Sequence, residues 1–106
     1  MEEKELYPSL IEKLSKEYSL EKKSLPTESN LEIIREHFRK KVIELMTHDY
    51  NRFINSLYRI DVDETKVHEI MMTKDKTLIP EKIADLIIER QLTRIKTQML
   101  YKQGKL

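Results

Sequence analysis

Apolar side chains recur every three or four positions along most of this chain, which is the spacing of one face of an α-helix. The longest series runs through residues 31–60, and shorter ones cover residues 6–20, 64–72 and 80–101. The only glycine is Gly104, so tight β-hairpin turns lack the residue they favour. We therefore expect an all-α fold, a small bundle of four or five helices, two of them long, around an antiparallel helical hairpin.

The boundaries of the long series leave two arrangements open. Residues 31–60 would form one helix of about 45 Å at 1.5 Å per residue. The alternative is a break at 47–49, where Thr47 and Asp49 compete for backbone hydrogen bonds. The continuous helix is our first expectation.

Capping residues predict where the helices begin. A hydroxyl at Ser29 stands three residues before Glu32, the spacing of a capping box, so we expect Ser29 to open the long series. Asp61 or Asp63 is expected to cap the helix that follows. Pro80 is expected in the first turn of the last helix, where a missing N–H costs no hydrogen bond.

The length of 106 residues fits a single domain spanning 1–106. Within it, residues 1–28 are predicted to form an N-terminal helix and a surface loop. Residues 29–101 are predicted to form the main helical core, and 102–106 a flexible tail.

Charge and composition exclude several classes of protein. The chain has 20 basic and 19 acidic residues, a net charge of +1, which lacks the strong positive charge of a typical nucleic-acid binder. It has no cysteine, hence no disulfide and no Cys-based zinc site, which suits a reducing compartment. The charged start and short apolar runs argue against a secretory signal and a membrane span. We expect a cytoplasmic protein.

Candidate chemistry is sparse. Glu44 and His48 are four residues apart, as are Glu64 and His68, but neither spacing matches a known metal-binding pattern, and His37 has no carboxylate at an informative spacing. The acids at 61–64 lack the glycine and alternating spacing of a calcium loop, and helix capping accounts for them. No motif ties a hydroxyl to a histidine base. We predict no catalytic residue, no metal site and no cofactor; a small enzyme or metal-binding protein is the third hypothesis.

The last helix carries the candidate partner-binding surface. Its apolar residues continue with alternating spacings of four and three, the seam of a helix that leans on one neighbour. These residues are Ile88, Leu92, Ile95 and Met99. Packing inside the domain would explain the same seam. The leading hypothesis is a non-catalytic protein that acts through protein–protein interaction, most readily as a homodimer, or through a helical partner.

The alternative hypothesis is an RNA- or anion-binding module. From residue 90 onward there are five basic residues and no acid, and the candidate contacts are Arg90, Arg94 and Lys96. In a helix-turn-helix protein the first turns of this helix would enter a DNA groove. Those turns carry the acids Glu81, Asp85 and Glu89, so nucleic acid is possible but not favoured.

Overall fold

All regular elements that the structure describes are helical. The computed structural model describes residues 3–25 and 30–104. The α-helices are α1 (Tyr7–Tyr18), α2 (Leu31–His48), α3 (Tyr50–Arg59), α4 (Glu64–Met71) and α5 (Ile79–Lys102). Three short 3-10 helices are η1 (Glu3–Leu6), η2 (Lys22–Ser24) and η3 (Lys76–Leu78). The predicted all-α bundle is confirmed.

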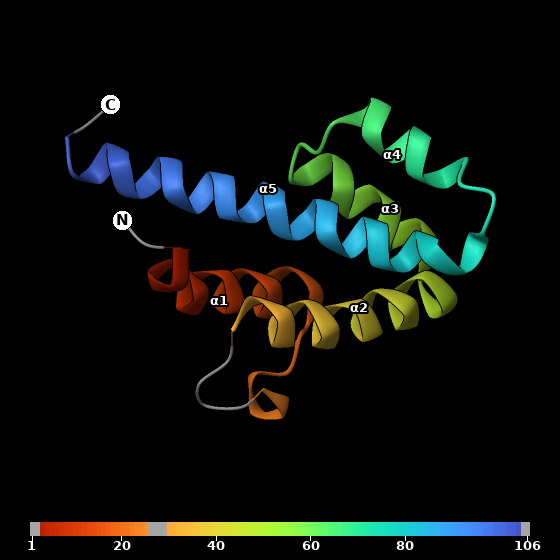
Figure 1. Ribbon diagram of the computed structural model, residues 1–106, viewed down its shortest axis with the longest axis horizontal. Helices are drawn as coiled ribbons and strands as arrows, with labels where there is room; N and C mark the ends of the chain where they lie inside the picture. The colour runs from red at the N-terminus through yellow and green to blue at the C-terminus, as the bar shows by residue number, and fades with distance from the viewer. Residues whose placement is uncertain (1–2, 26–29, 105–106) are drawn as a thin grey trace.

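Two long helices form the centre of the bundle. The helices α2 and α5 run antiparallel and pack along each other (Figure 1), although α3 and α4 separate them in the sequence, so they do not form a hairpin of consecutive helices. The first helix, α1, lies beside the C-terminal half of α5, and α4 lies beside its N-terminal half. The helix α5 therefore has different neighbours at its two ends.

The single long helix expected over residues 31–60 is wrong, and the alternative with two helices is confirmed. The helix α2 ends at His48 and α3 begins at Tyr50, with Asp49 between them at φ −150° and ψ 50°. Just before the break, the Thr47 hydroxyl donates a hydrogen bond of 2.7 Å to the Ile43 carbonyl. The apolar stripe is buried on both sides of the bend, at Ile34, Phe38, Val42, Phe53 and Leu57. Because the chain changes direction at Asp49, the side chains of one apolar stripe enter the same core from both α2 and α3.

Side-chain caps begin two of the described α-helices. The Asn30 side chain accepts from the Ile33 N–H at 2.9 Å and caps α2, whereas the expected cap, Ser29, lies outside the described residues. Asp63 caps α4 by accepting from the Thr65 N–H at 2.8 Å. Pro80 stands in the first turn of α5, as predicted.

The segments at the two predicted boundaries are partly described. In the loop expected before residue 29, η2 forms a short turn, and Lys22 pairs with Glu12 of α1. At the other end, Lys102 is the last residue of α5 and Gly104 has φ 71°, so the tail predicted at 102–106 begins inside a helix. Residues 26–29 and 105–106 lie outside the described ranges.

Three aromatic rings from three helices meet in the core. The ring centroid of Tyr18 lies 5.3 Å from that of Phe38 and 5.9 Å from that of Phe53. The Tyr18 hydroxyl is 3.1 Å from the buried Ser56 hydroxyl. Burial raises the pKa of Tyr18 above its usual value, and the Ser56 hydrogen bond opposes this more weakly. The phenol therefore stays neutral and joins α1 to α3 through a hydrogen bond inside an apolar core.

The end of α1 offers a simple test of backbone strain. Ser19 has φ 58° and ψ 31°, a left-handed conformation that glycine adopts more easily at helix ends. Its neighbour Leu20 is buried and its N–H reaches back to the Leu14 carbonyl, so the conformation is fixed. We expect Ser19→Gly to raise the free energy of unfolding by about 1 kcal/mol in urea denaturation. Ser15→Gly, inside the same helix, should lower it by about as much, and equal effects of the two variants would contradict this account.

Candidate interaction surface

The predicted stripe on α5 is divided between the core and the surface. Ile88 and Ile95 are buried, with exposed fractions of 0% and 2%. Leu92 and Met99 are partly buried and pack against the edge of the same core. The helices α1 and α2 both contact α5, and their buried side chains share one cluster with Ile88. A partner could therefore reach Leu92 and Met99 on this face, but not Ile88 or Ile95.

Arg90 has two acceptors within the chain. Its Nε donates a hydrogen bond of 3.0 Å to the carbonyl of Ile60, the residue that caps the end of α3. Its Nη2 lies 3.7 Å from Oδ2 of Asp61. A cation at the end of a helix is stabilised by the helix dipole and by the free carbonyls. Arg90 thus joins α5 to the end of α3.

The structure does not bring the three predicted basic residues together. Arg90 and Arg94 are four residues apart and lie on one side of α5, and Arg94 is partly buried without an ion pair among the described residues. Lys96 is exposed and follows Arg94 by two residues, which is about 200° around the helix. One small anion cannot contact all three side chains.

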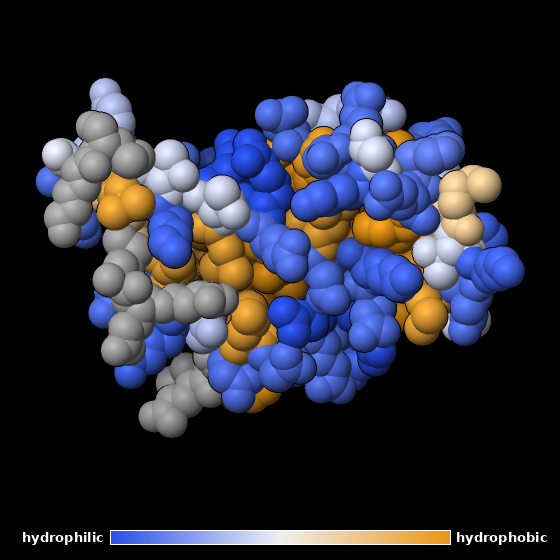
Figure 2. Space-filling view, turned by 45° about the horizontal axis from the view of Figure 1, so that its top comes forward, coloured by the Kyte–Doolittle hydropathy of each residue, from blue (hydrophilic) through white to orange (hydrophobic). Residues whose placement is uncertain are grey.

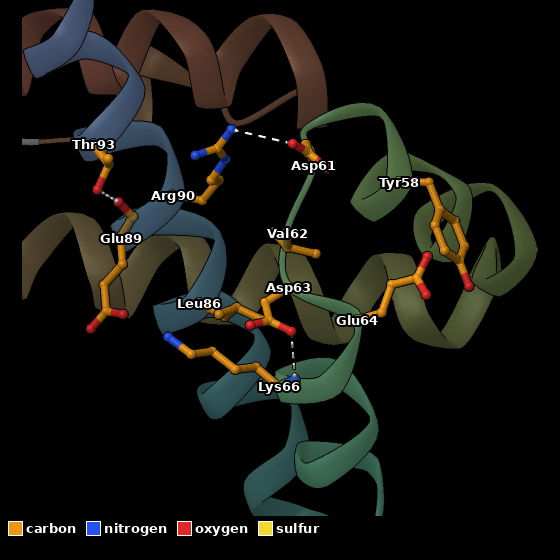
Figure 3. A pocket seen from close by; sticks show the side chains of 10 residues that line it. All are labelled: Tyr58, Asp61, Val62, Asp63, Glu64, Lys66, Leu86, Glu89, Arg90 and Thr93. Carbon is orange, nitrogen blue, oxygen red and sulfur yellow. Dashed lines mark hydrogen bonds and ion pairs between the residues drawn. The ribbon is translucent and has the colours of Figure 1, made fainter.

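A groove opens beside Arg90, between the N-terminal end of α4 and the middle of α5 (Figure 3). Its volume is about 630 Å³. One wall comes from the α3–α4 connection and the start of α4, and the other from α5. The lining residues are Tyr58, Asp61, Val62, Asp63, Glu64, Lys66, Leu86, Glu89, Arg90 and Thr93. The groove is open to solvent and joins the outward side of α5.

Acidic side chains outnumber basic ones in this groove. Asp61 has φ 58°, and its side chain is 90% exposed although one oxygen faces Arg90. The Asp63 carboxylate is engaged in capping α4. Glu89 extends away from Arg90 in Figure 3 and has no ion pair among the described residues. The lining holds four acids against Lys66 and Arg90, so it keeps an excess of negative charge, and with Asp61 facing Arg90 this excess lies mainly on Glu64 and Glu89.

Asp85 lies one turn before Glu89 and belongs to the contact with α2. Its Oδ1 is 2.8 Å from Nε of Arg35, which also pairs with Glu32 on its own helix. Burial raises the pKa of the Asp85 carboxyl above its usual value, and the Arg35 guanidinium lowers it less. Asp85 is thus a partly buried link between α2 and α5, whereas Glu89 is an exposed charge.

The histidine and carboxylate candidates from the sequence do not cluster in the described part of the chain. Among the described residues, which include all three histidines, no three His, Asp or Glu side chains gather closely enough to hold a metal ion. None of the helices in the described ranges is both long enough and apolar enough to span a membrane. Among the acids at 61–64, Asp63 caps α4 and Asp61 adopts a left-handed backbone conformation. All three acids line the groove.

Sequence reasoning missed Glu89 and Leu100 as surface residues of interest. The sequence does indicate that Glu89 lacks a basic partner on its own helix. The residues three and four positions away are Asp85, Leu86, Leu92 and Thr93, none of them basic. Leu100 is partly buried but is not among the side chains packed against the core. The periodicity assigned no role to Leu100 because it lies off the seam.

Comparison with known proteins finds no protein-family model, no curated protein and no solved structure that matches this chain.

Proposed function

We propose that this chain is a non-catalytic helical protein of the cytoplasm that acts by associating with a second copy of itself. One observation carries the proposal: the outward side of α5 holds apolar side chains that the rest of the chain covers only in part. These are Leu86, Leu92, Met99 and Leu100. Partly exposed apolar side chains on the outward side of a helix are typical of helix–helix interfaces between chains.

The basic-residue hypothesis has less support. Binding of RNA or of an anion would use Arg90, Arg94 and Lys96, but Arg90 is engaged by Ile60 and Asp61 within the chain. Lys96 lies about 200° around the helix from Arg94 and does not line the groove beside Arg90, whose excess of acids repels phosphate.

The proposal predicts a mass that depends on concentration. We expect light scattering after size-exclusion chromatography to give a mass near twice 12.8 kDa at high concentration and a decrease on dilution. Leu100→Asp should reduce the dimer by at least about tenfold in association constant, because it places a charge in an apolar contact. Circular dichroism should stay unchanged, since Leu100 lies outside the core cluster.

A matched variant separates this surface from exposed apolar residues in general. Ile43 on α2 is 46% exposed, so Ile43→Asp makes the same chemical change elsewhere. Its mass should equal that of the unmodified chain. A mass of 12.8 kDa at every concentration of the unmodified chain would refute self-association.

A further inference from the structure

Two exposed charges of opposite sign stand on the outward side of α5 without a partner. Glu89 and Lys96 have no ion pair among the described residues. On their own helix, the positions three and four residues from Lys96 hold only Leu92, Thr93, Met99 and Leu100. The helix itself therefore cannot neutralise either charge.

Both charges lie on one line along the helix, with an apolar residue between them. Positions 85, 89, 92, 96 and 99 follow alternating spacings of four and three, so they form a single row. Leu92 stands between Glu89 and Lys96 in this row and is partly exposed. Figure 2 shows that apolar side chains reach the surface among charged ones in the middle of this side of the molecule.

Charge is also segregated along α5. The first half, residues 79–90, carries all three acids of the helix, Glu81, Asp85 and Glu89, together with Lys82 and Arg90, and no acid follows Glu89. The second half carries Arg94, Lys96 and Lys102. Two copies of such a helix attract each other when they run antiparallel, because the half that holds every acid of the helix then meets the half whose charges are all basic.

From this placement we infer that two copies of the chain pair through α5 in antiparallel orientation across Leu92, with Glu89 of each copy opposite Lys96 of the other. The inference rests on the proposed self-association and gives it a register. A two-fold axis between residues 92 and 93 leaves Glu89 and Lys96 equally far from the centre, about 5 Å along the helix. The same axis places Leu86 opposite Met99 of the second copy.

The groove beside α4 strengthens the attraction for the incoming lysine. Lys96 of the second copy approaches at Glu89, which lines the groove together with Asp61 and Glu64. The positive charge of Arg90 is taken up by Ile60 and Asp61. The groove's four acids exceed its two basic residues, Lys66 and Arg90, so a lysine of the second copy meets an excess of negative charge there.

The size of the contact predicts a weak, salt-sensitive dimer. The 24 residues of α5 extend about 36 Å, and we expect a contact through this one helix to bury less area than the roughly 1,200 Å² or more of a stable interface. Exposed ion pairs weaken as salt rises. We expect association at micromolar or higher concentrations, decreasing by about tenfold or more between about 50 mM and 500 mM salt.

Charge reversal tests the register. Glu89→Lys and Lys96→Glu should each weaken the dimer by about tenfold or more, because each variant turns two attractive pairs into two repulsive ones. An equimolar mixture of the two variants should restore association to near that of the unmodified chain. In that mixed pair the two substituted side chains face each other with opposite charges, and the second contact keeps Glu89 against Lys96. Sedimentation equilibrium at low salt measures the association of Glu89→Lys, of Lys96→Glu and of their mixture.

A control pair of the same chemistry lies on α2, where Lys40 Nζ is 3.9 Å from Oε1 of Glu36. Glu36→Lys and Lys40→Glu should leave association unchanged, alone and mixed. Dimers that form as well with Glu89→Lys and Lys96→Glu as without them would overturn the register and leave self-association standing. Weakened single variants that do not recover on mixing would also overturn it. A monomeric unmodified chain would remove both proposals.

Discussion

We expect Phe38→Ala to lower the free energy of unfolding by about 3–5 kcal/mol. Phe38 on α2 has no exposed surface and contacts the ring of Tyr18 edge-on, so its removal leaves a cavity among three helices. The loss includes the transfer of the ring from the core to water and the contacts that the cavity walls no longer make. Domains of this size have a total stability of about 5–15 kcal/mol, so the variant would be close to unfolding.

Urea denaturation followed by circular dichroism measures the effect. An unchanged dependence of the free energy of unfolding on urea concentration would show that the variant and the unmodified chain have comparable folded states. Tyr50 at the start of α3 is 48% exposed, which makes Tyr50→Ala the matched control. Tyr50→Ala should lower the free energy of unfolding by less than about 1 kcal/mol. Similar costs for the two variants would mean that the aromatic cluster is not the centre of the core.

The location of Phe38 in the core could be predicted from the sequence, whereas the bend at Asp49 could not be decided. The apolar series continues through residues 47–49 without a change of period, because helices on both sides of the bend bury the same stripe. Backbone hydrogen bonds also continue across it: the Asp49 N–H reaches Leu45, and the Phe53 N–H reaches Asp49. A break made by one residue's dihedral angles leaves little trace in hydrophobic spacing.

The candidate surface was predictable only in part, for a related reason. Periodicity identifies the apolar side of a helix but does not tell which neighbour covers it. Ile88 and Ile95 are buried in the core cluster that also holds side chains of α1 and α2, while Leu92 and Met99 pack against that cluster. The groove joins residues 58–66 to 86–93, and no local pattern could predict that approach.

Arg90 shows why electrostatic patterns need tertiary context. Within α5 it has no acidic neighbour three or four positions away, which is also true of Lys96. The fold gives Arg90 the Ile60 carbonyl and Asp61 as acceptors, both distant in sequence, and leaves Lys96 exposed. A basic residue without an acidic neighbour on its own helix therefore stabilises the fold at position 90. At position 96 such a residue stays exposed and available for binding.

We expect Gln91→Met to raise the free energy of unfolding by about 1–2 kcal/mol. Gln91 on α5 is only 1% exposed, and its Oε1 has no hydrogen-bond partner in the described part of the chain. A buried carbonyl oxygen without a donor costs the full penalty of leaving water. Methionine has nearly the same length and shape and adapts to irregular spaces, so it removes the penalty without opening a cavity.

Two further variants decide whether burial of the amide is the cause. Gln98→Met changes the same group about two turns further along α5, where the side chain is exposed, and should shift stability by less than about 0.5 kcal/mol. Gln91→Glu keeps the shape but buries a charge, so it should destabilise the chain, and more at pH 8 than at pH 5 because the carboxylate must ionise in the core. Thermal melts at both pH values measure this. A loss of stability in Gln91→Met would mean that the amide makes a favourable contact in the core, and Gln91 would then be a stabilising polar residue.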